Sequence, residues 1–183
     1  ALPICHADHM KSIFYAMEHC WQAVDDKPTL TVSYVQCPHY PFVFDRNGNP
    51  VDGGQNIRDQ HYYLDQLQYL NSVLETSISG ILEHDPDSVI VLQSDHGTRY
   101  PGQMLLFYGE PDYDPLLETP YMQNSLNCVY YGGKPLSIEG ETGINTWRIL
   151  LNEIYGTNFP MLPAPEGYTC YGRSWHDKPK EFH

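Results

Sequence analysis

The sequence has 183 residues, about the length of one domain, and carries a formal net charge of −13 at pH 7. This charge opposes binding to nucleic acid or to an anionic membrane surface, and it opposes an anionic substrate unless a bound cation reverses the local field. The five cysteines are scattered without Cys-x-x-Cys spacing, which argues against a zinc ribbon and leaves a single disulfide open. No apolar run approaches the roughly 20 residues of a membrane span. Because the chain begins abruptly at Ala1, without a signal-peptide pattern, we expect a fragment or a processed form.

The first half of the chain is expected to form two amphipathic helices with a strand between them. Apolar residues recur every three or four positions from Ala7 to Val24, with Asp8 as N-cap, and again from Ile57 to Glu83. Residues 29–36 (Thr-Leu-Thr-Val-Ser-Tyr-Val-Gln) are β-branched and alternate in polarity, which predicts a strand. The prolines that follow are expected to hold His39 at the carboxyl end of that strand.

The central stretch is 89–97, Val-Ile-Val-Leu-Gln-Ser-Asp-His-Gly. Its β-branched and aliphatic run predicts a buried strand of a parallel sheet, ending in Asp95 and His96. Ligands of open α/β sheets bind outside the carboxyl ends of the strands, and a carboxylate and an imidazole placed there suit a divalent metal. The same Asp-His-Gly sequence would also occur at a strand end where the Asp is only an N-cap and the His lies on the surface. The motif alone therefore does not distinguish a metal site from such a strand end.

The second half is expected to add a strand over Leu126–Tyr131, a helix over Thr142–Tyr155 closed by Gly156, and an irregular tail over 158–183. The order of helices and strands predicts the α/β class, with a mostly parallel sheet flanked by helices. Three strands make a thin sheet for helices of this length. We therefore expect only part of a domain to be present.

Four stretches resemble the carboxyl-terminal half of the sulfatase-like domain of the alkaline phosphatase superfamily. The branch most resembled comprises bacterial membrane-anchored sulfatase-like hydrolase/transferases, relatives of lipoteichoic acid synthase and the phosphoethanolamine transferases. The stretches are 38–42 (Pro-His-Tyr-Pro-Phe), 63–71, 89–97 and 143–152 with Tyr155-Gly156. The resemblance implies an alkaline phosphatase-like fold, of which residues 1–183 would be a single partial domain.

The resemblance also implies half of an active site. Asp95 and His96 would bind a divalent metal ion (Mn, Zn, Mg or Ca), and His39 would bind the phosphate or sulfate of the substrate. Arg99 could neutralise an anionic substrate, although a surface role is equally compatible. The strand that carries the nucleophile and a further metal carboxylate in the family has no counterpart here, and the Cys/Ser-x-Pro-x-Arg signature of sulfatases is absent. We therefore expect the chain to be inactive alone, with the upstream part of the same polypeptide completing the site.

The resulting hypothesis is a metal-dependent hydrolase or transferase acting on phosphate or sulfate esters. By resemblance, upstream helices would hold it at the outer face of the bacterial cytoplasmic membrane. Two alternatives stay open: a non-catalytic module that binds an anionic glycan or lipid head group, and a structural domain whose motif is residual. An upstream nucleophile would favour the enzyme and its absence the binding module, whereas an effect of Asp95→Ala on stability alone would favour the structural domain.

Overall fold

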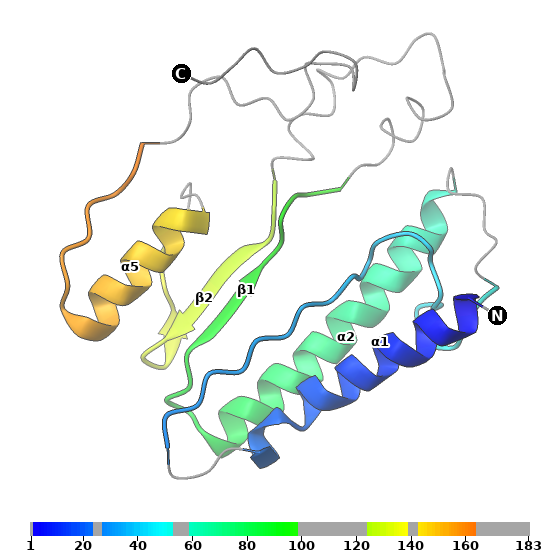
Figure 1. The fold of residues 1–183 in the computed structure, drawn as a ribbon, viewed down its shortest axis with the longest axis horizontal. Helices are drawn as coiled ribbons and strands as arrows, with labels where there is room; N and C mark the ends of the chain where they lie inside the picture. Colours follow the sequence, from blue (N-terminus) through cyan, green and yellow to red (C-terminus); the bar gives the residue numbers. More distant parts are fainter. Residues whose placement is uncertain (1, 24–26, 53–58, 99–123, 139–142, 164–183) are drawn as a thin grey trace, which may run out of the picture. The chain divides into compact units, whose positions relative to one another are not determined.

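The chain divides into two units, Ala1–Ser88 and Val89–His183, and each is described by itself. The computed structural model describes residues 2–23, 27–52, 59–98, 124–138 and 143–163. The first unit contains two helices that lie side by side, and the second contains a small sheet and one helix (Figure 1).

The first helical segment is shorter at its carboxyl end than its periodicity predicts. The structure has helix α1 (Leu2–Glu18) followed by a separate 3-10 helix, η1 (Cys20–Ala23). Asp8 therefore lies inside α1 and does not cap it. In η1 the Trp21 ring stacks on the ring of His84 with centroids 3.5 Å apart, while its Nε1 donates to the Glu18 carbonyl at 3.1 Å. These contacts fix the tight turn at the end of α1 against the second helix.

Helix α2 (Gln60–His84), with 25 residues, is the longest element in the described ranges. The side chain of Asp59 caps its start by accepting from the His61 N–H, and at its end the Asp85 N–H donates to the Ile81 carbonyl. The buried face does not follow the apolar periodicity of 57–83 throughout, because Leu64, which that periodicity includes, is 44% exposed. The buried positions are Gln66, Leu70, Val73 and Ser77.

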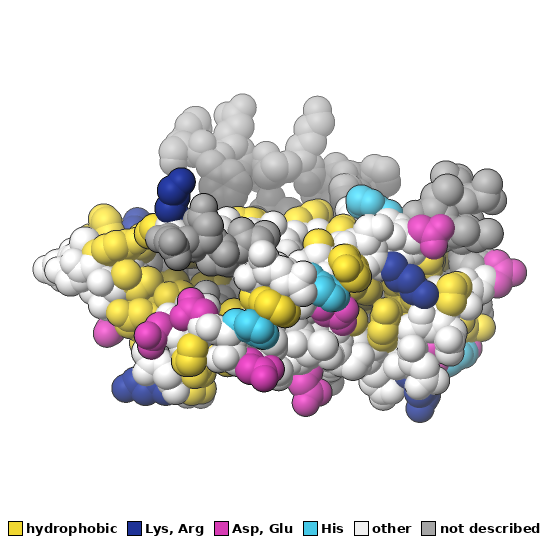
Figure 2. Space-filling view, turned by 90° about the horizontal axis from the view of Figure 1, so that it is seen from below, with side chains coloured by type: hydrophobic (Ala, Val, Ile, Leu, Met, Phe, Trp, Pro, Cys, Tyr) yellow, Lys and Arg dark blue, Asp and Glu magenta, His cyan; other side chains and the backbone are white. Residues whose placement is uncertain are grey.

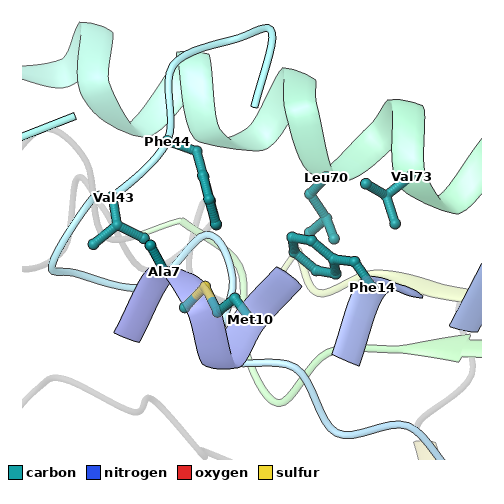
Figure 3. Close-up of a cluster of buried hydrophobic side chains, with 7 residues drawn as sticks. All are labelled: Ala7, Met10, Phe14, Val43, Phe44, Leu70 and Val73. Atoms are coloured by element: carbon teal, nitrogen blue, oxygen red, sulfur yellow. The ribbon is translucent and has the colours of Figure 1, made fainter. Parts of the chain in front are cut away.

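The core of the first unit lies where α1, α2 and the loop around residue 44 meet (Figure 3). Phe14 of α1 packs against Phe44 and against Tyr69 of α2, with centroids 6.1 and 5.6 Å apart. Phe44 and Tyr69 also contact each other edge to face at 5.1 Å. The buried members of this cluster are Ala7, Met10, Phe14, Val43, Phe44, Leu70 and Val73.

The carboxylate of Asp45 closes the loop that follows Phe44. Asp45 Oδ1 accepts from the backbone N–H groups of Asn47 and Asn49 at 2.8 Å each, and Oδ2 accepts from Asn49 Nδ2 at 2.9 Å. The hydrogen bonds from Asn49 are the main reason that the pKa of Asp45 lies below its usual value. Gly48 has φ +79° and a Cβ built on it would lie 2.4 Å from the Tyr69 ring, so the loop lies directly on the core.

The sheet of the second unit has three strands: β1 (Ile90–Gln93), β2 (Asn127–Tyr131) and β3 (Lys134–Pro135). Their order is β1-β2-β3, and both pairs are antiparallel. Val91 is opposite Val129 in the first pair, and Tyr131 is opposite Lys134 in the second. Gly132 and Gly133, with φ +62° and +77°, form the two-residue hairpin turn between β2 and β3.

The predicted fold is therefore wrong: in the part of the chain that the structure describes, three helices are combined with one small antiparallel sheet, not a mostly parallel sheet. Residues 29–36 are described, but they form no strand. Parallel neighbours need a crossover connection, usually a helix, whereas β1 and β2 are neighbours in the sheet that pair antiparallel. The composition of 89–97 is compatible with a parallel or an antiparallel strand, and it cannot specify the direction of the partner.

Helix α5 (Gly143–Tyr155) covers the sheet of the second unit, as its amphipathic pattern predicts. Its Leu150 packs with Val129 and Ile138 in a buried cluster. Two asparagines of α5 hold the segment that follows it. Asn145 donates to the carbonyl of Leu162 and accepts from its N–H, both at 2.9 Å. Asn152 holds Phe159 in the same way, at 3.1 and 2.8 Å.

The surface carries the negative charge of the sequence together with exposed apolar groups. On the face drawn in Figure 2, acidic side chains are spread among hydrophobic ones. Among the large hydrophobic residues that the structure describes, the most exposed are Leu30, Val32 and Tyr34.

The cysteines of the described residues differ in environment, which gives a labelling prediction. Burial raises the pKa of the Cys37 thiol from 9.0 to about 12, whereas Cys128 is exposed. At about pH 8 we expect iodoacetamide to modify Cys128 readily and Cys37 only as the first unit opens. Peptide mass spectrometry after timed labelling measures both rates, and equal rates would contradict the prediction.

The same thiol gives a pH dependence. The unfolded thiol ionises near its ordinary pKa of 9.0, whereas the folded thiol stays neutral up to about pH 12. The folded state therefore keeps its full stability with respect to this thiol below pH 9. As the pH rises toward 12, ionisation of the thiol favours the unfolded state, and the free energy of unfolding falls by at most roughly 1.4 kcal/mol per pH unit. Urea unfolding of a Cys37→Ala variant should show a weaker alkaline loss than the unchanged chain.

Candidate functional site

Strand β1 leads directly to the candidate metal ligands, and its end is fixed by Ser94. The Ser94 N–H donates to the Leu126 carbonyl at 2.9 Å, and its Oγ accepts from the Leu126 N–H at 2.7 Å. Pairing with the neighbouring segment therefore continues one residue beyond β1. Asp95 is the first residue beyond this pairing.

A polar network ties the same strand end to helix α5. Gln93 Nε2 donates to Asn127 Oδ1 at 3.0 Å, and Gln93 Oε1 accepts from Trp147 Nε1 at 2.9 Å. Asn127 Nδ2 in turn donates to the Oγ1 of the buried Thr146 at 2.7 Å. Because each amide is bonded on both sides, the network fixes the rotamers next to the motif.

Asp95 and His96 lie together at this end of the strand. The backbone N–H of His96 donates to Asp95 Oδ1 at 3.0 Å, and Oδ2 lies 3.8 Å from His96 Nε2. The Asp95 side chain is 88% exposed, whereas that of His96 is 27% exposed. The pair presents a carboxylate oxygen and an imidazole nitrogen that one ligand could contact together.

The hydrogen bonding of His96 favours metal binding through Nε2. Its Nδ1 lies 2.6 Å from the Gly97 carbonyl oxygen, which can only accept, so the network assigns the hydrogen of the neutral ring to Nδ1. Metal-binding histidines usually donate their other ring N–H in this way. An ion with bonds of about 2.0–2.5 Å can bridge the 3.8 Å between Oδ2 and Nε2. The two residues therefore fit a divalent metal.

The pair supplies only part of a coordination shell. Within the ranges that the structure describes, no group of three or more His, Cys, Asp or Glu side chains could hold a metal ion. Zinc takes about four ligands, and calcium about six to eight. The remaining ligands would have to be water, substrate or residues that are not described. The net charge of −13 favours the approach of a cation.

His39, the predicted substrate-binding residue, belongs to the first unit, whereas Asp95 and His96 belong to the second. Its side chain is exposed, and its Nδ1 is hydrogen-bonded to the Tyr40 carbonyl. The peptide bonds before Pro38 and Pro41 are cis. Arg99, the other predicted substrate-binding residue, lies outside the described residues.

Gln66 holds the His39 loop, and sequence reasoning did not identify it as part of a site. Its side chain is fully buried, its Nε2 donates to the His39 carbonyl at 3.2 Å, and its Oε1 accepts from the Val43 N–H at 2.8 Å. The available signal was a polar residue four positions before Leu70, on the buried face of α2. Gln93 gave a similar signal, as a polar residue just before the Ser-Asp-His-Gly motif.

None of the helices in the described ranges combines the length and the apolar character that crossing a bilayer requires. Comparison of the chain with models of protein families, with curated proteins and with solved structures gives no match.

Proposed function

We propose that this chain is the carboxyl-terminal part of a metal-dependent hydrolase or transferase that acts on phosphate or sulfate esters. Asp95 and His96 would contribute two ligands to a divalent metal ion, and the nucleophile would come from upstream sequence of the same polypeptide. The observation that carries the proposal is the pairing of Asp95 Oδ2 with His96 Nε2 at 3.8 Å. The resemblance of four stretches to sulfatase-like hydrolase/transferases supports the substrate class.

A bound divalent metal would polarise an ester oxygen and lower the pKa of an attacking hydroxyl. The task of the chain is to keep its two ligands in place. The hydrogen bond from His96 Nδ1 to the Gly97 carbonyl orients the ring, and the one from the His96 N–H holds Asp95 Oδ1. Ser94 fixes the backbone just before them. The ligands are thus positioned before an ion arrives, which lowers the ordering cost of binding.

His39 would contact the anionic part of the ester. The Tyr40 carbonyl accepts from Nδ1, which leaves Nε2 as the ring atom available to a ligand. Nε2 can donate to an ester oxygen only when the ring is protonated.

Metal binding by the chain itself is the first test, and it needs no catalysis. Isothermal titration with Mn²⁺, Zn²⁺, Mg²⁺ and Ca²⁺ should show binding that Asp95→Asn weakens by about tenfold or more. The matched control is Glu153→Gln, which removes the same charge from an exposed position on α5 and should bind as the unchanged chain does. Equal affinity for all three proteins would overturn the metal site.

The chain extended by its upstream sequence tests the reaction. We expect metal-dependent turnover of one substrate among an aryl phosphate, an aryl phosphodiester and an aryl sulfate, and its loss in Asp95→Ala. The ester that is cleaved would name the substrate class. A folded protein that binds metal through Asp95 but turns over none of the three would support the alternative, a module that binds an anionic glycan or lipid head group.

A further inference from the structure

Residues 29–36 have the composition of a strand and the exposure of a surface loop. Leu30, Val32 and Tyr34 alternate along the segment and are 82%, 79% and 77% exposed. Within the described part of the chain, the backbone N–H and C=O groups of residues 30–36 form no hydrogen bond. The segment runs as an extended trace in Figure 1. Its carboxyl end is anchored, because Val35 and Cys37 pack against the core of the first unit.

An anchored, extended segment of this kind is a template for strand addition. Another extended backbone could pair with these groups in place of water, and three apolar side chains would be covered at the same time. Natural proteins protect such edges with Lys or Pro, but the segment contains no charged residue and no proline. The occupant that fits is therefore a β-strand that is itself apolar on one face.

The segment is complementary to itself about Val32. In an antiparallel pair centred there, Val32 lies opposite Val32, Leu30 lies opposite Tyr34 and Thr31 lies opposite Ser33. Aliphatic and aromatic residues would share one face, and hydroxyl residues the other. Such cross-strand pairs stabilise a sheet by about 0.2–1 kcal/mol each. A two-fold axis through Val32 makes the contact isologous, so that the same edge of the segment is used on both chains.

We propose that residues 29–36 pair antiparallel with the same segment of a second copy of this chain. To form this dimer, the pairing must overcome the electrostatic repulsion between two chains that each carry a net charge of −13. Because the segment itself is uncharged, salt weakens the repulsion without weakening the contact. The dimer should therefore strengthen as the ionic strength rises, opposite to the behaviour of a dimer held by ion pairs.

Sedimentation velocity of the full chain over a range of concentrations tests the proposal, at about 0.05 M and about 0.5 M salt. We expect a monomer–dimer equilibrium that shifts toward the dimer at the higher salt. Val32→Lys places two like charges opposite each other and should raise the dissociation constant at least tenfold. The matched control is Ile144→Lys, an apolar-to-lysine change at a 62% exposed position of α5, which should leave the equilibrium unchanged.

Hydrogen exchange separates the remaining outcomes. In the dimer, amides of residues 30–36 should exchange slowly, and dilution or Val32→Lys should restore fast exchange. A chain that stays monomeric at both salt concentrations would overturn the proposal. So would slow exchange that does not depend on concentration, which would mean that the same chain covers the segment. Equal effects of the two lysine variants would show that any dimer uses another surface.

Discussion

Replacing Gly48 by Ala is expected to destabilise the first unit by about 2–5 kcal/mol. The backbone of Gly48 has φ +79°, a conformation that costs an alanine about 1–2 kcal/mol. The new Cβ would also lie 2.4 Å from Cε2 and 2.5 Å from Cζ of Tyr69. That ring is itself held between Phe14 and Phe44, so it cannot move without disturbing the core.

Gly133→Ala separates the two causes. Gly133 has nearly the same backbone conformation, φ +77°, but nothing lies within 4 Å of the position of its Cβ. It should therefore cost only the backbone term of about 1–2 kcal/mol. Urea-dependent hydrogen exchange of peptides from α1 and α2 reports the first unit, and peptides from β2 report the second. Equal losses in the free energy of unfolding for the two variants would mean that the Tyr69 ring moves aside without a measurable cost.

Replacing Gln66 by Leu is expected to cost about 2–4 kcal/mol, the second large effect. The change leaves the Val43 N–H and the His39 carbonyl without their partner, and Val43 is 0% exposed, so water cannot substitute easily there. Each buried polar group left unpaired costs about 1–3 kcal/mol. Gln66→Glu keeps the acceptor for Val43 but turns a carboxylate oxygen toward the His39 carbonyl, and it should also destabilise.

Gln68→Leu is the matched control, because Gln68 is exposed on the same helix two positions away. It should change the free energy of unfolding by less than about 0.5 kcal/mol. The measurement is again hydrogen exchange of α1 and α2 peptides in urea, together with exchange of the loop at 39–43. A loss no larger for Gln66→Leu than for Gln68→Leu would show that the buried amide does not stabilise this loop.

The helices could be predicted from the sequence because their signals are local. The periodicity of α5 and the glycine after it identify a helix of nearly the observed length, and the Gly156 N–H closes it by donating to the Asn152 carbonyl. The register of α2 was harder to predict. Gln66 and Ser77 are buried because their polar groups find partners, Ser77 on the Val73 carbonyl within its own turn. A prediction of the buried face from hydrophobicity alone therefore omits both residues.

The sheet could not be predicted, because pairing is not a local property. Residues 29–36 and 90–93 have the same β-branched character, yet only the second segment is paired. The alternation in 29–36 shows which side chains share a face, and it does not show whether another strand lies alongside. The Asp95–His96 pair could be placed at a strand end from the sequence, whereas the tautomer of His96 follows from its contact with the Gly97 carbonyl.

Two asparagine clamps on α5 hold the backbone of the following segment, and one side chain of that segment adds to them, because Thr157 Oγ1 donates to Asn152 Oδ1 at 2.9 Å. Asn145 and Asn152 are seven positions apart, two helical turns, and each binds the N–H and C=O of one residue. Phe159 and Leu162 are held through backbone groups that every residue except proline possesses, and their side chains are 42% and 41% exposed. The path of the segment is therefore set largely by two residues of the helix, Asn145 and Asn152. Replacing Phe159 or Leu162 by a residue other than proline would keep these hydrogen bonds, whereas insertion of one residue between the clamped positions would break the match.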